Sequence, residues 1–377
     1  MKSHVLIVAE SLEPTNGWGR YSLDLALGLQ KLGYRVSTLV HTKSVLPTEI
    51  EQHLGLPLAS ALLGSNPVGL MQTACAFQRV LTRLKPDIMH ITVEPYSLAA
   101  GLVLPHATRL VLAGHGTYAG GLFRMGIIKR LLSSLAIQRA SLLIALSQYT
   151  REDWKNAVPR PLRKLFNQRC QVATGGVPDA FFQSMAEKLA DQPAQILFVG
   201  QVKPRKGVRE AILACDAFNR QYNHPFVFHI VGSFDSSSDY TKELLSLIHD
   251  KALDAKIVFH GKVTDAKLLT LYQQADLYLM LPRRIGNQFE GYGLVYLEAN
   301  ARGIPAISSN EGGCREAVSD DVSGYVVAPD DPAAIADRMA DILVRRKISA
   351  SSCIEWAWQN HSSRLTQQLC SAYESLA

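Results

Sequence analysis

Short runs of apolar, often β-branched residues alternate along the chain with longer stretches of helical periodicity. In the first half, the apolar runs span residues 5–9, 36–40, 88–92, 110–114 and 142–146. Between them, apolar positions recur at helical spacing in 21–32 and in 71–84, the latter ending before Pro86. This alternation predicts parallel strands joined by crossover helices. A basic, proline-containing stretch at 151–169 interrupts the pattern.

The alternation begins again in the second half of the chain. The strands predicted there are 196–200, 226–232, 257–259, 277–281, 306–308 and 325–327. Two such series predict an α/β protein with two doubly wound, Rossmann-like domains, divided near 175–192. We expect domains at residues 1–180 and 181–347, with a helical segment at 348–377 that packs back toward the first domain. Ligands of such sheets bind beyond the carboxyl ends of the strands, so two sheets with facing strand ends would form one cleft.

Composition narrows the class of protein. The chain has 377 residues, more than one hydrophobic core usually serves, which agrees with two domains. Its 47% hydrophobic and 19% charged residues are ordinary for a soluble globular protein. The formal net charge of +6 suits an anionic substrate such as a nucleotide diphosphate, or contact with an acidic membrane surface. No polybasic run with interleaved aromatic residues indicates a nucleic-acid groove.

The cysteines and apolar runs indicate a compartment. Six cysteines lie far apart without a Cys-x-x-Cys pair, which argues against a zinc site or a disulfide framework and for a reducing environment. The apolar run near the N-terminus is followed by Glu10 and Glu13, so it is interpreted as a buried strand and not as a signal peptide. No apolar stretch reaches the roughly 20 residues that a membrane-spanning helix requires. We expect a cytoplasmic protein, at most peripheral to a membrane.

The most informative segment of the chain surrounds two glutamates. Gly291 and Gly293 permit tight turns, and a helix is expected to begin near Leu294. The first amide N–H groups of a helix are unpaired and lie at the positive end of its dipole, which suits a pyrophosphate. Glu298, about one turn into the helix, suits the hydroxyls of a ribose, while Glu290 lies nearer the sugar end of a bound donor. Alone, these features also fit a glycine-rich loop with two solvated glutamates.

A basic loop supports the interpretation of the two-glutamate segment as a pyrophosphate and ribose site. Residues 199–208 follow the first predicted strand of the second domain and precede a helix predicted at 209–218. Arg205 and Lys206 can bind phosphate oxygens there, the lysine as a point charge and the arginine as a fork. A basic loop alone is usually a solvated surface. Because both segments lie at strand-to-helix junctions of one predicted domain, together they indicate a nucleotide-diphosphate site.

The second half of the chain resembles glycosyltransferase family 4 (GT4), whose members are retaining enzymes with the GT-B fold of two Rossmann-like domains facing across a cleft. The resemblance covers residues 196–330, where Glu290 and Glu298 match the paired glutamates of the family. Other motifs in the family's order are Lys206-Gly207, Phe259-His-Gly-Lys262, Leu271-Tyr272 with Ala275-Asp276, Ala301-Arg-Gly-Ile-Pro305, Gly312-Gly313 with Glu316, and Gly324 with Asp330. Several spaced motifs make the resemblance specific.

The resemblance implies an activity and a set of roles. The activity is transfer of a hexose, with retention, from a UDP-, GDP- or ADP-hexose to a hydroxyl acceptor such as a saccharide, a sugar phosphate or a lipid. Glu298 would bind ribose, Glu290 would lie by the sugar and α-phosphate, and Lys206 would bind the diphosphate. The base would meet the main chain at Lys262 and Val263. The donor-binding set is Gly17, Gly19, Gln201, Arg205, Lys206, Lys262, Val263, Glu290, Gly291, Tyr292, Gly293, Leu294 and Glu298.

One position departs from the family pattern. Gln201 stands where the family usually has an arginine that clamps the diphosphate, directly after the glycine that ends the strand. Either Lys203 or Arg205 compensates, or the donor is held less by charge. We favour Arg205, because a guanidinium can span two phosphate oxygens.

The first half resembles the family less, as expected for an acceptor-binding domain. Residues 16–21 follow the first predicted strand, where the family has a glycine-rich loop. Gly17 and Gly19 would let the backbone approach the diphosphate or the acceptor. His115 follows a predicted strand, and the resemblance implies that it contacts the donor sugar or the reacting region. His115 and Glu290 are therefore the expected catalytic residues.

Three other features of the first half are given structural interpretations. Residues 122–139 mix apolar and basic side chains where lipid-modifying relatives carry a membrane-docking helix. They are predicted to form a core helix whose basic side chains extend to solvent, with peripheral membrane contact as the alternative. His90 is interpreted as structural, and Ser147 as a packing or capping residue.

No metal or cofactor is expected. The Asp-x-Asp triplet of metal-dependent transferases and the His-Glu-x-x-His motif are both absent. The charge of the leaving diphosphate would be neutralised by Lys206 and helix amides.

Two other functions stay open. A sugar-nucleotide-modifying Rossmann enzyme would need a full Gly-x-Gly-x-x-Gly after the first strand and an acidic residue closing the second, where this chain has His41-Thr42. A non-catalytic nucleotide-sugar-binding protein is the closer alternative because of Gln201. The base, hexose, acceptor and oligomeric state are not determined by these patterns.

Overall fold

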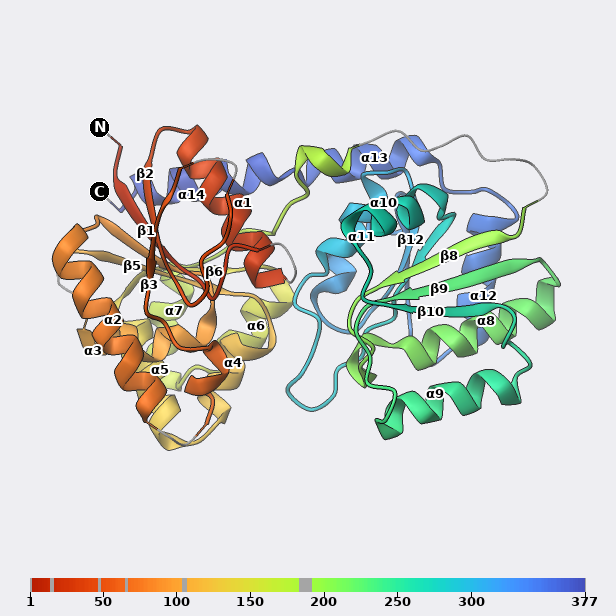
Figure 1. Ribbon diagram of the computed structural model, residues 1–377, viewed down its shortest axis with the longest axis horizontal. Coiled ribbons are helices and arrows are strands. Elements are labelled where there is room, and N and C mark those ends of the chain that lie inside the picture. Colours follow the sequence, from red (N-terminus) through yellow and green to blue (C-terminus); the bar gives the residue numbers. More distant parts are fainter. Residues whose placement is uncertain are drawn as a thin grey trace. The chain divides into compact units, whose positions relative to one another are not determined.

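The structure is a computed structural model that describes residues 2–13, 17–46, 49–64, 67–103, 107–182 and 192–376. The chain divides into two compact units. The first comprises Met1–Gly176 with Ser362–Ala377, and the second comprises Val177–His361. Each unit is built on one parallel β-sheet with helices packed beside it (Figure 1).

The sheet of the first unit has the strand order β3-β2-β1-β4-β5-β6-β7. Its strands are β1 (His4–Val8), β2 (Arg35–Val40), β3 (Glu51–Leu54), β4 (Ile88–Ile91), β5 (Arg109–Gly114), β6 (Ala140–Ala145) and β7 (Cys170–Val172). All residues of β1 are buried, as expected for a central strand covered on both faces. The order reverses between β1 and β4, so the carboxyl ends of these neighbours form the place where such sheets usually bind a ligand.

Helices connect the strands of the first unit. They are α1 (Gly17–Lys31), α2 (Val68–Leu84), α3 (Ser97–Val103), α4 (Thr117–Arg124), α5 (Ile127–Arg139), α6 (Gln148–Ala157) and α7 (Arg163–Arg169), with the short 3-10 helices η1 (Ala59–Leu62), η2 (Glu94–Tyr96) and η3 (Arg160–Leu162). α3 packs against α2 and α5, and α4 packs against α5 and α6.

The last helix of the chain also belongs to the first unit. α14 (Ser362–Glu374) packs so closely on α1 that a Cβ on Gly28 would lie 2.3 Å from Oγ1 of Thr366. The Tyr373 hydroxyl is hydrogen-bonded to Nδ1 of His90 at 2.5 Å. His90 is fully buried, which confirms the structural role predicted for it.

The sheet of the second unit has the order β10-β9-β8-β11-β12-β13. Its strands are β8 (Ala194–Val199), β9 (Phe226–Val231), β10 (Ile257–Gly261), β11 (Leu277–Leu279), β12 (Ala306–Ser309) and β13 (Gly324–Val327). Its helices are α8 (Val208–Tyr222), α9 (Asp239–Asp250), α10 (Asp265–Gln274), α11 (Leu294–Asn300), α12 (Pro332–Leu343) and α13 (Ala350–Gln359), with η4 (Asp179–Phe181), η5 (Pro204–Lys206) and η6 (Gly313–Glu316). Here the order reverses between β8 and β11.

Part of the first half differs from its prediction. Residues 151–169, predicted as an interruption, lie mostly in α6 and α7. Ser147 caps α6, since its Oγ accepts the Thr150 amide N–H at 2.9 Å, which confirms the capping role. The strands β3 and β7 were not predicted, because they are only four and three residues long and leave little periodic signal; β3 is also mostly polar.

The prediction of a single core helix at 122–139 is wrong. Gly126, with φ of +104°, separates α4 from α5. Ala136 and Ile137 are buried, but Ile127 and Ile128 are 74% and 69% exposed. The segment is therefore amphipathic, with an apolar surface on its solvent side.

The C-terminal segment at 348–377 forms two helices that pack in different units. α13 packs against α11 of the second unit, and only α14 packs against the first. The dividing region predicted at 175–192 includes residues 183–191, which lie outside the described residues.

Candidate functional site

The turn between β8 and α8 places two cationic side chains at the switch point of the second sheet, which is the place where the strand order reverses between β8 and β11. Gly207 has φ of +70°, and a Cβ there would lie 1.7 Å from the Leu281 carbonyl oxygen, so only glycine fits without rearrangement. The Arg283 amide N–H donates to the Arg205 carbonyl at 2.9 Å. These contacts hold η5, which carries Arg205 and Lys206, against the chain that follows β11.

Glu290 binds both of these cations and forms a cluster with Arg205 and Lys206. Its Oε2 accepts from Nζ of Lys206 at 2.5 Å and from Nη1 of Arg205 at 3.1 Å. Burial acts to raise the pKa of Glu290, but the charges of Lys206 and then Arg205 outweigh burial, and the pKa is lowered. The carboxylate is therefore ionised and forms charge-assisted hydrogen bonds with both cations.

The Gly312-Gly313 motif fixes the backbone of Glu290. The Gly313 amide N–H donates to the Glu290 carbonyl at 2.8 Å. A Cβ on Gly312, whose φ is +90°, would lie 2.8 Å from the same oxygen. The loop after β12 therefore needs glycine to approach the loop that carries Glu290.

Glu298 lies on α11 beside a buried aromatic and cationic pair. Oε2 of Glu298 accepts from the Tyr272 hydroxyl at 3.2 Å. Arg302 is 1% exposed, and its guanidinium carbon lies 5.7 Å from the centre of the Tyr272 ring and 5.5 Å from that of Phe181. Burial lowers the pKa of Arg302, while Tyr272 and Glu298 act to raise it. Arg302 therefore stabilises the side chain that orients Glu298.

The structure distinguishes the residues considered as replacements for the missing arginine. Gln201 and Lys203 are exposed, whereas Arg205 is half-buried and bound to Glu290. Lys262 and Val263 follow β10, two places from β8 in the strand order. They lie at the carboxyl edge of the same sheet, and Lys262 is exposed.

The remaining predicted residues of the second unit surround the start of α11. Gly293 has φ of +83° and directly precedes Leu294, where α11 begins as predicted. Tyr292 is buried, and its hydroxyl donates to Oδ1 of Asn360 at 3.2 Å, so this side chain supports the loop. Gly291, between Glu290 and Tyr292, is buried as well.

In the first unit, the predicted glycines lie in a helix and not in a loop. Gly17 and Gly19 belong to the first turn of α1, and the preceding Asn16 lies outside the described residues. A Cβ on Gly19 would lie 1.9 Å from the Glu13 carbonyl oxygen, so the chain itself requires glycine there. No atom of the described residues lies within 4 Å of the position that a Cβ on Gly17 would take.

His115 follows β5 and is partly buried. Its ring packs edge-on against Tyr21, with 4.6 Å between ring centres. Burial lowers the pKa of His115 to about 3, although a hydrogen bond to the Thr92 backbone acts in the opposite direction. The imidazole is therefore neutral at physiological pH, and its Nε2 is a buried nitrogen without a hydrogen-bond partner among the described residues.

Sequence reasoning missed several residues near these sites. Tyr272 and Arg302 were noted only as parts of motifs, and their contact joins α10 to the turn that follows α11. Glu94 was not considered, although a carboxylate just after a buried strand is a recognisable signal in a parallel sheet. Its Oε2 accepts from Nε1 of Trp18 at 2.9 Å.

Two family profiles match the chain. Residues 180–357 match the family described as Glycosyl transferases group 1, and residues 15–166 match Glycosyltransferase Family 4. The chain belongs to glycosyltransferase family 4. The match at residues 15–166 covers β2 to β6 of the first sheet and the match at residues 180–357 covers every strand of the second sheet, and the predicted family assignment is confirmed.

Known proteins similar to this family 4 chain include curated sequences and solved structures. A GDP-mannose-dependent alpha-(1-6)-phosphatidylinositol monomannoside mannosyltransferase of Mycobacterium tuberculosis is 27% identical over 192 residues, which are 48% of each chain. The aligned chain thus spans about half the length of that relative. Anabaena Alr3699/HepE in complex with UDP has a TM-score of 0.74 at 20% identity, with both chains fully covered.

A third protein shares the fold. Sucrose-phosphate synthase of Thermosynechococcus elongatus has a TM-score of 0.77 at 17% identity, covering 100% of this chain and 99% of the other. With the two parallel sheets, these similarities confirm the predicted two-domain, Rossmann-like GT-B fold. Among the described residues, no helix of this family 4 chain is both long and apolar enough to cross a membrane.

Proposed function

We propose that this chain is a retaining glycosyltransferase that moves a hexose from a nucleotide-diphosphate sugar to a hydroxyl acceptor. The observation that carries the proposal is the convergence of Lys206 and Arg205 on Glu290, at the switch point of the second sheet. Two cations there suit a diphosphate, and Glu298 on the adjoining helix suits the ribose.

The cluster is suited to binding and to catalysis. A diphosphate would compete with Glu290 for Lys206 and Arg205, so the cations are already oriented when the donor binds. As the bond between C1 of the hexose and the diphosphate breaks, both cations would stabilise the charge that develops on the leaving group. The acceptor oxygen would bond to C1 on the face that the diphosphate leaves, and its proton would pass to the leaving phosphate. Configuration would then be retained.

His115 would act at the sugar. Its imidazole is neutral and its Nε2 is buried, so a rearrangement that exposes Nε2 would let it accept a hydrogen bond from a sugar hydroxyl without adding charge beside the reacting carbon. No step in this scheme requires a metal ion, and we propose metal-independent transfer.

Donor binding tests the proposal directly. Thermal shift with UDP-, GDP- and ADP-sugars should identify a stabilising donor, with GDP-mannose tried first because the M. tuberculosis relative is named for it. Lys206→Ala and Glu298→Ala should each weaken that binding roughly 10- to 100-fold, since each removes a charged hydrogen-bond partner. Lys242→Ala, an exposed lysine on α9, is the matched control and should bind normally.

Two results would contradict the proposal. The donor site is wrong if Lys206→Ala and Glu298→Ala bind every nucleotide as the wild type does. A donor that binds and yet transfers no hexose to saccharide, sugar phosphate or lipid acceptors would favour the non-catalytic nucleotide-sugar-binding alternative. Loss of transfer in excess EDTA, restored by magnesium or manganese, would contradict metal independence.

A lipid-borne acceptor is favoured by the surface of α5. Ile127, Ile128 and Leu131 are 74%, 69% and 64% exposed, and Arg130 is exposed beside them. Apolar side chains flanked by basic ones suit an anionic membrane surface. We therefore propose that the first unit contacts a membrane through this helix.

Vesicle binding tests the membrane contact. The wild type should co-sediment with vesicles containing phosphatidylglycerol and bind more weakly to vesicles of phosphatidylcholine alone, because the basic residues favour anionic lipid. Ile127→Glu together with Ile128→Glu should abolish binding, because both exposed apolar side chains are lost. Leu245→Glu, at a residue of α9 that is 49% exposed, is the control and should bind as the wild type does. Equal binding by both variants would exclude α5 as the contact.

A further inference from the structure

A buried carboxylate occupies the switch point of the first sheet. Glu94 follows β4 as the first residue of η2 and is only 4% exposed. Carboxylates are rarely buried to this degree unless hydrogen bonds or cations satisfy them. Glu94 has no part in the proposed transfer, yet it follows β4, one of the two strands between which the order of the first sheet reverses.

The carboxylate joins the ends of three strands. Oε1 accepts from the backbone N–H of His115 at 2.7 Å, and Oε2 accepts from Nε1 of Trp18 at 2.9 Å. The backbone N–H of Gly116 also donates to it. Trp18 lies in the segment after β1, Glu94 follows β4, and His115 and Gly116 follow β5. One side chain therefore connects the start of α1 to the turn that carries His115.

The contact with Glu94 determines where His115 lies. The amides of His115 and of Gly116, the next residue, both donate to Glu94, and Gly116 has φ of +152°, a conformation that favours glycine. With its backbone held there, the imidazole packs on Tyr21 and donates to the Thr92 carbonyl. Trp18 in turn packs near Tyr118, with 5.7 Å between ring centres.

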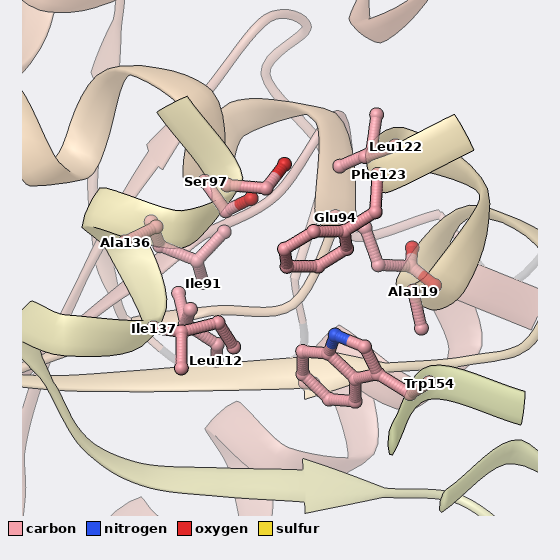
Figure 2. Close-up of a pocket in the computed structure, with 12 residues that line it drawn as sticks. Ile91, Glu94, Ser97, Leu112, Ala119, Leu122, Phe123, Ala136, Ile137 and Trp154 are labelled. Carbon is pink, nitrogen blue, oxygen red and sulfur yellow. The ribbon is translucent and has the colours of Figure 1, made fainter. Parts of the chain in front are cut away.

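The surroundings of Glu94 are largely apolar. Figure 2 shows its carboxylate directed toward Ala119, beside a cavity of about 20 Å³ walled by Phe123 and Trp154. Burial raises the pKa of Glu94 to about 7, against the effect of its hydrogen bonds with its own backbone, His115, Trp18 and Gly116.

Few charged groups face Glu94 from the elements around it. Among the elements packed against η2, α3 and η1 carry no titratable side chain, and β5 has Arg109 at its opposite end. α4 carries Tyr118 and Arg124, whose guanidinium is paired with Asp153. α1, which supplies Trp18, also carries Arg20, Tyr21 and Asp24, and has Lys31 at its far end.

We propose that Glu94 is a positioning residue whose ionised carboxylate holds the Trp18 segment and the His115 turn together for catalysis. The N–H groups of Trp18, His115 and Gly116 all require an acceptor, which both oxygens of a carboxylate provide and a protonated or amidated group provides only in part. The catalytic consequence rests on the proposed function, because it acts through the contact of His115 with the donor sugar.

The hydrogen bond itself is tested without any activity. In protein labelled with ¹⁵N in its indoles, the Trp18 indole N–H resonance, assigned by its absence in Trp18→Phe, should shift with pH through a midpoint near 7, the pKa of Glu94. The shift should vanish in Glu94→Gln. A Trp18 resonance that does not move between pH 5.5 and 8.5 or that titrates unchanged in Glu94→Gln overturns the proposal.

The catalytic consequence is tested by the pH profile of kcat. In the wild type, kcat should fall on the acid side as Glu94 takes up a proton. Glu94→Gln should lose at least 10-fold in kcat and lack this acid limb, while Glu94→Asp should recover part of the activity with the limb present. Trp18→Phe should move the limb to higher pH, because a donor to the ionised carboxylate is lost. Glu152→Gln, at an exposed glutamate of α6, is the matched control and should keep the wild-type profile.

The outcomes separate this proposal from the proposed function. Wild-type kcat and a wild-type profile in Glu94→Gln would overturn the positioning role, even if the indole resonance titrates. A wild type that transfers no hexose from any donor would overturn the proposed function, and the indole titration would still decide whether Glu94 joins the two segments.

Discussion

Two cations, Lys206 and Arg205, share one carboxylate oxygen of Glu290. The position of Arg205 indicates how the chain compensates for the glutamine at position 201. Lys206 is the residue expected from the family pattern, whereas Arg205 reaches the same oxygen from the preceding position of η5. Lys203 is on the other side of Pro204 and is exposed. The fixed φ of the proline restricts the turn and directs the two side chains differently.

Arg205 is therefore expected to replace the missing arginine. Arg205→Ala should raise the donor's KM roughly 10-fold, because a half-buried charge-assisted contact to phosphate is worth about 1.5 kcal/mol. Lys203→Ala and Gln201→Ala should change KM by less than about twofold. Steady-state kinetics with the donor found by thermal shift would measure all three. If only Gln201→Ala raises KM, the glutamine itself binds the donor and the compensation is wrong.

At the scale of elements, glycines decide where the loops of the second unit approach one another. Gly207 ends η5, precedes α8 and leaves no space for a side chain beside Leu281. Gly286 also has positive φ, +58°, but within the part of the chain that the structure describes no atom lies within 4 Å of the position that a Cβ would take. A substitution at Gly286 therefore measures backbone strain alone, whereas one at Gly207 measures backbone strain together with steric contact.

Gly207→Ala should destabilise the protein far more than Gly286→Ala. Both force alanine into a left-handed conformation, which costs about 1–2 kcal/mol. Only at Gly207 would the new methyl also meet a backbone carbonyl, so the total there should exceed about 3 kcal/mol. Urea unfolding would measure the difference in unfolding free energy. Equal losses in both variants would mean that the β8–α8 turn can move away from Leu281.

At the scale of the whole molecule, buried and partly buried histidines couple folding to pH. The pKa is lowered for His4, His53, His90, His115, His229 and His260, chiefly by burial. For His90 it falls from 6.5 to about 3. Below pH 6.5 the unfolded chain binds protons that the native histidines do not. The contribution of these histidines to the free energy of unfolding is therefore fully present above pH 6.5 and is lost as pH falls toward the folded pKa. Glu94 has a raised pKa, so between pH 4.5 and about 7 the native state binds a proton that the unfolded chain does not. Its contribution to the free energy of unfolding therefore rises as pH falls through this range.

His90→Asn should reduce this acid sensitivity. One proton corresponds to at most about 1.4 kcal/mol per pH unit, so between pH 6 and pH 4 the variant should lose about 1 kcal/mol per unit less than the wild type. Asparagine keeps a polar atom toward the Tyr373 hydroxyl. Urea unfolding at several pH values would measure the slope. An unchanged slope would show that His90 becomes protonated in the folded state.

The fold was largely predictable from the sequence because local burial leaves a local pattern. Strands covered on both faces must be apolar throughout, and β1, β4 and β5 were recognised for that reason. The turn at Arg205 and Lys206, the start of α11 at Leu294 and the two glutamates also followed from residue types at strand-to-helix junctions. The division of α4 from α5 did not follow from the sequence, because one glycine in an apolar segment does not by itself indicate that a helix ends. Gly126 also does not show which face of the segment is left exposed.

Tertiary structure alone decided which distant residues meet. Lys206 and Glu290 are 84 positions apart, and Trp18 and Glu94 are 76 apart. Periodicity reports which side of an element is buried, but the order of strands in a sheet determines which loops become neighbours. The sequence by itself therefore determined two parallel-sheet domains and singled out the residues of the proposed nucleotide-diphosphate site. Only the folded chain decided that Arg205 and not Lys203 meets Glu290, that α14 packs in the first unit, and that Glu94 joins three strand ends.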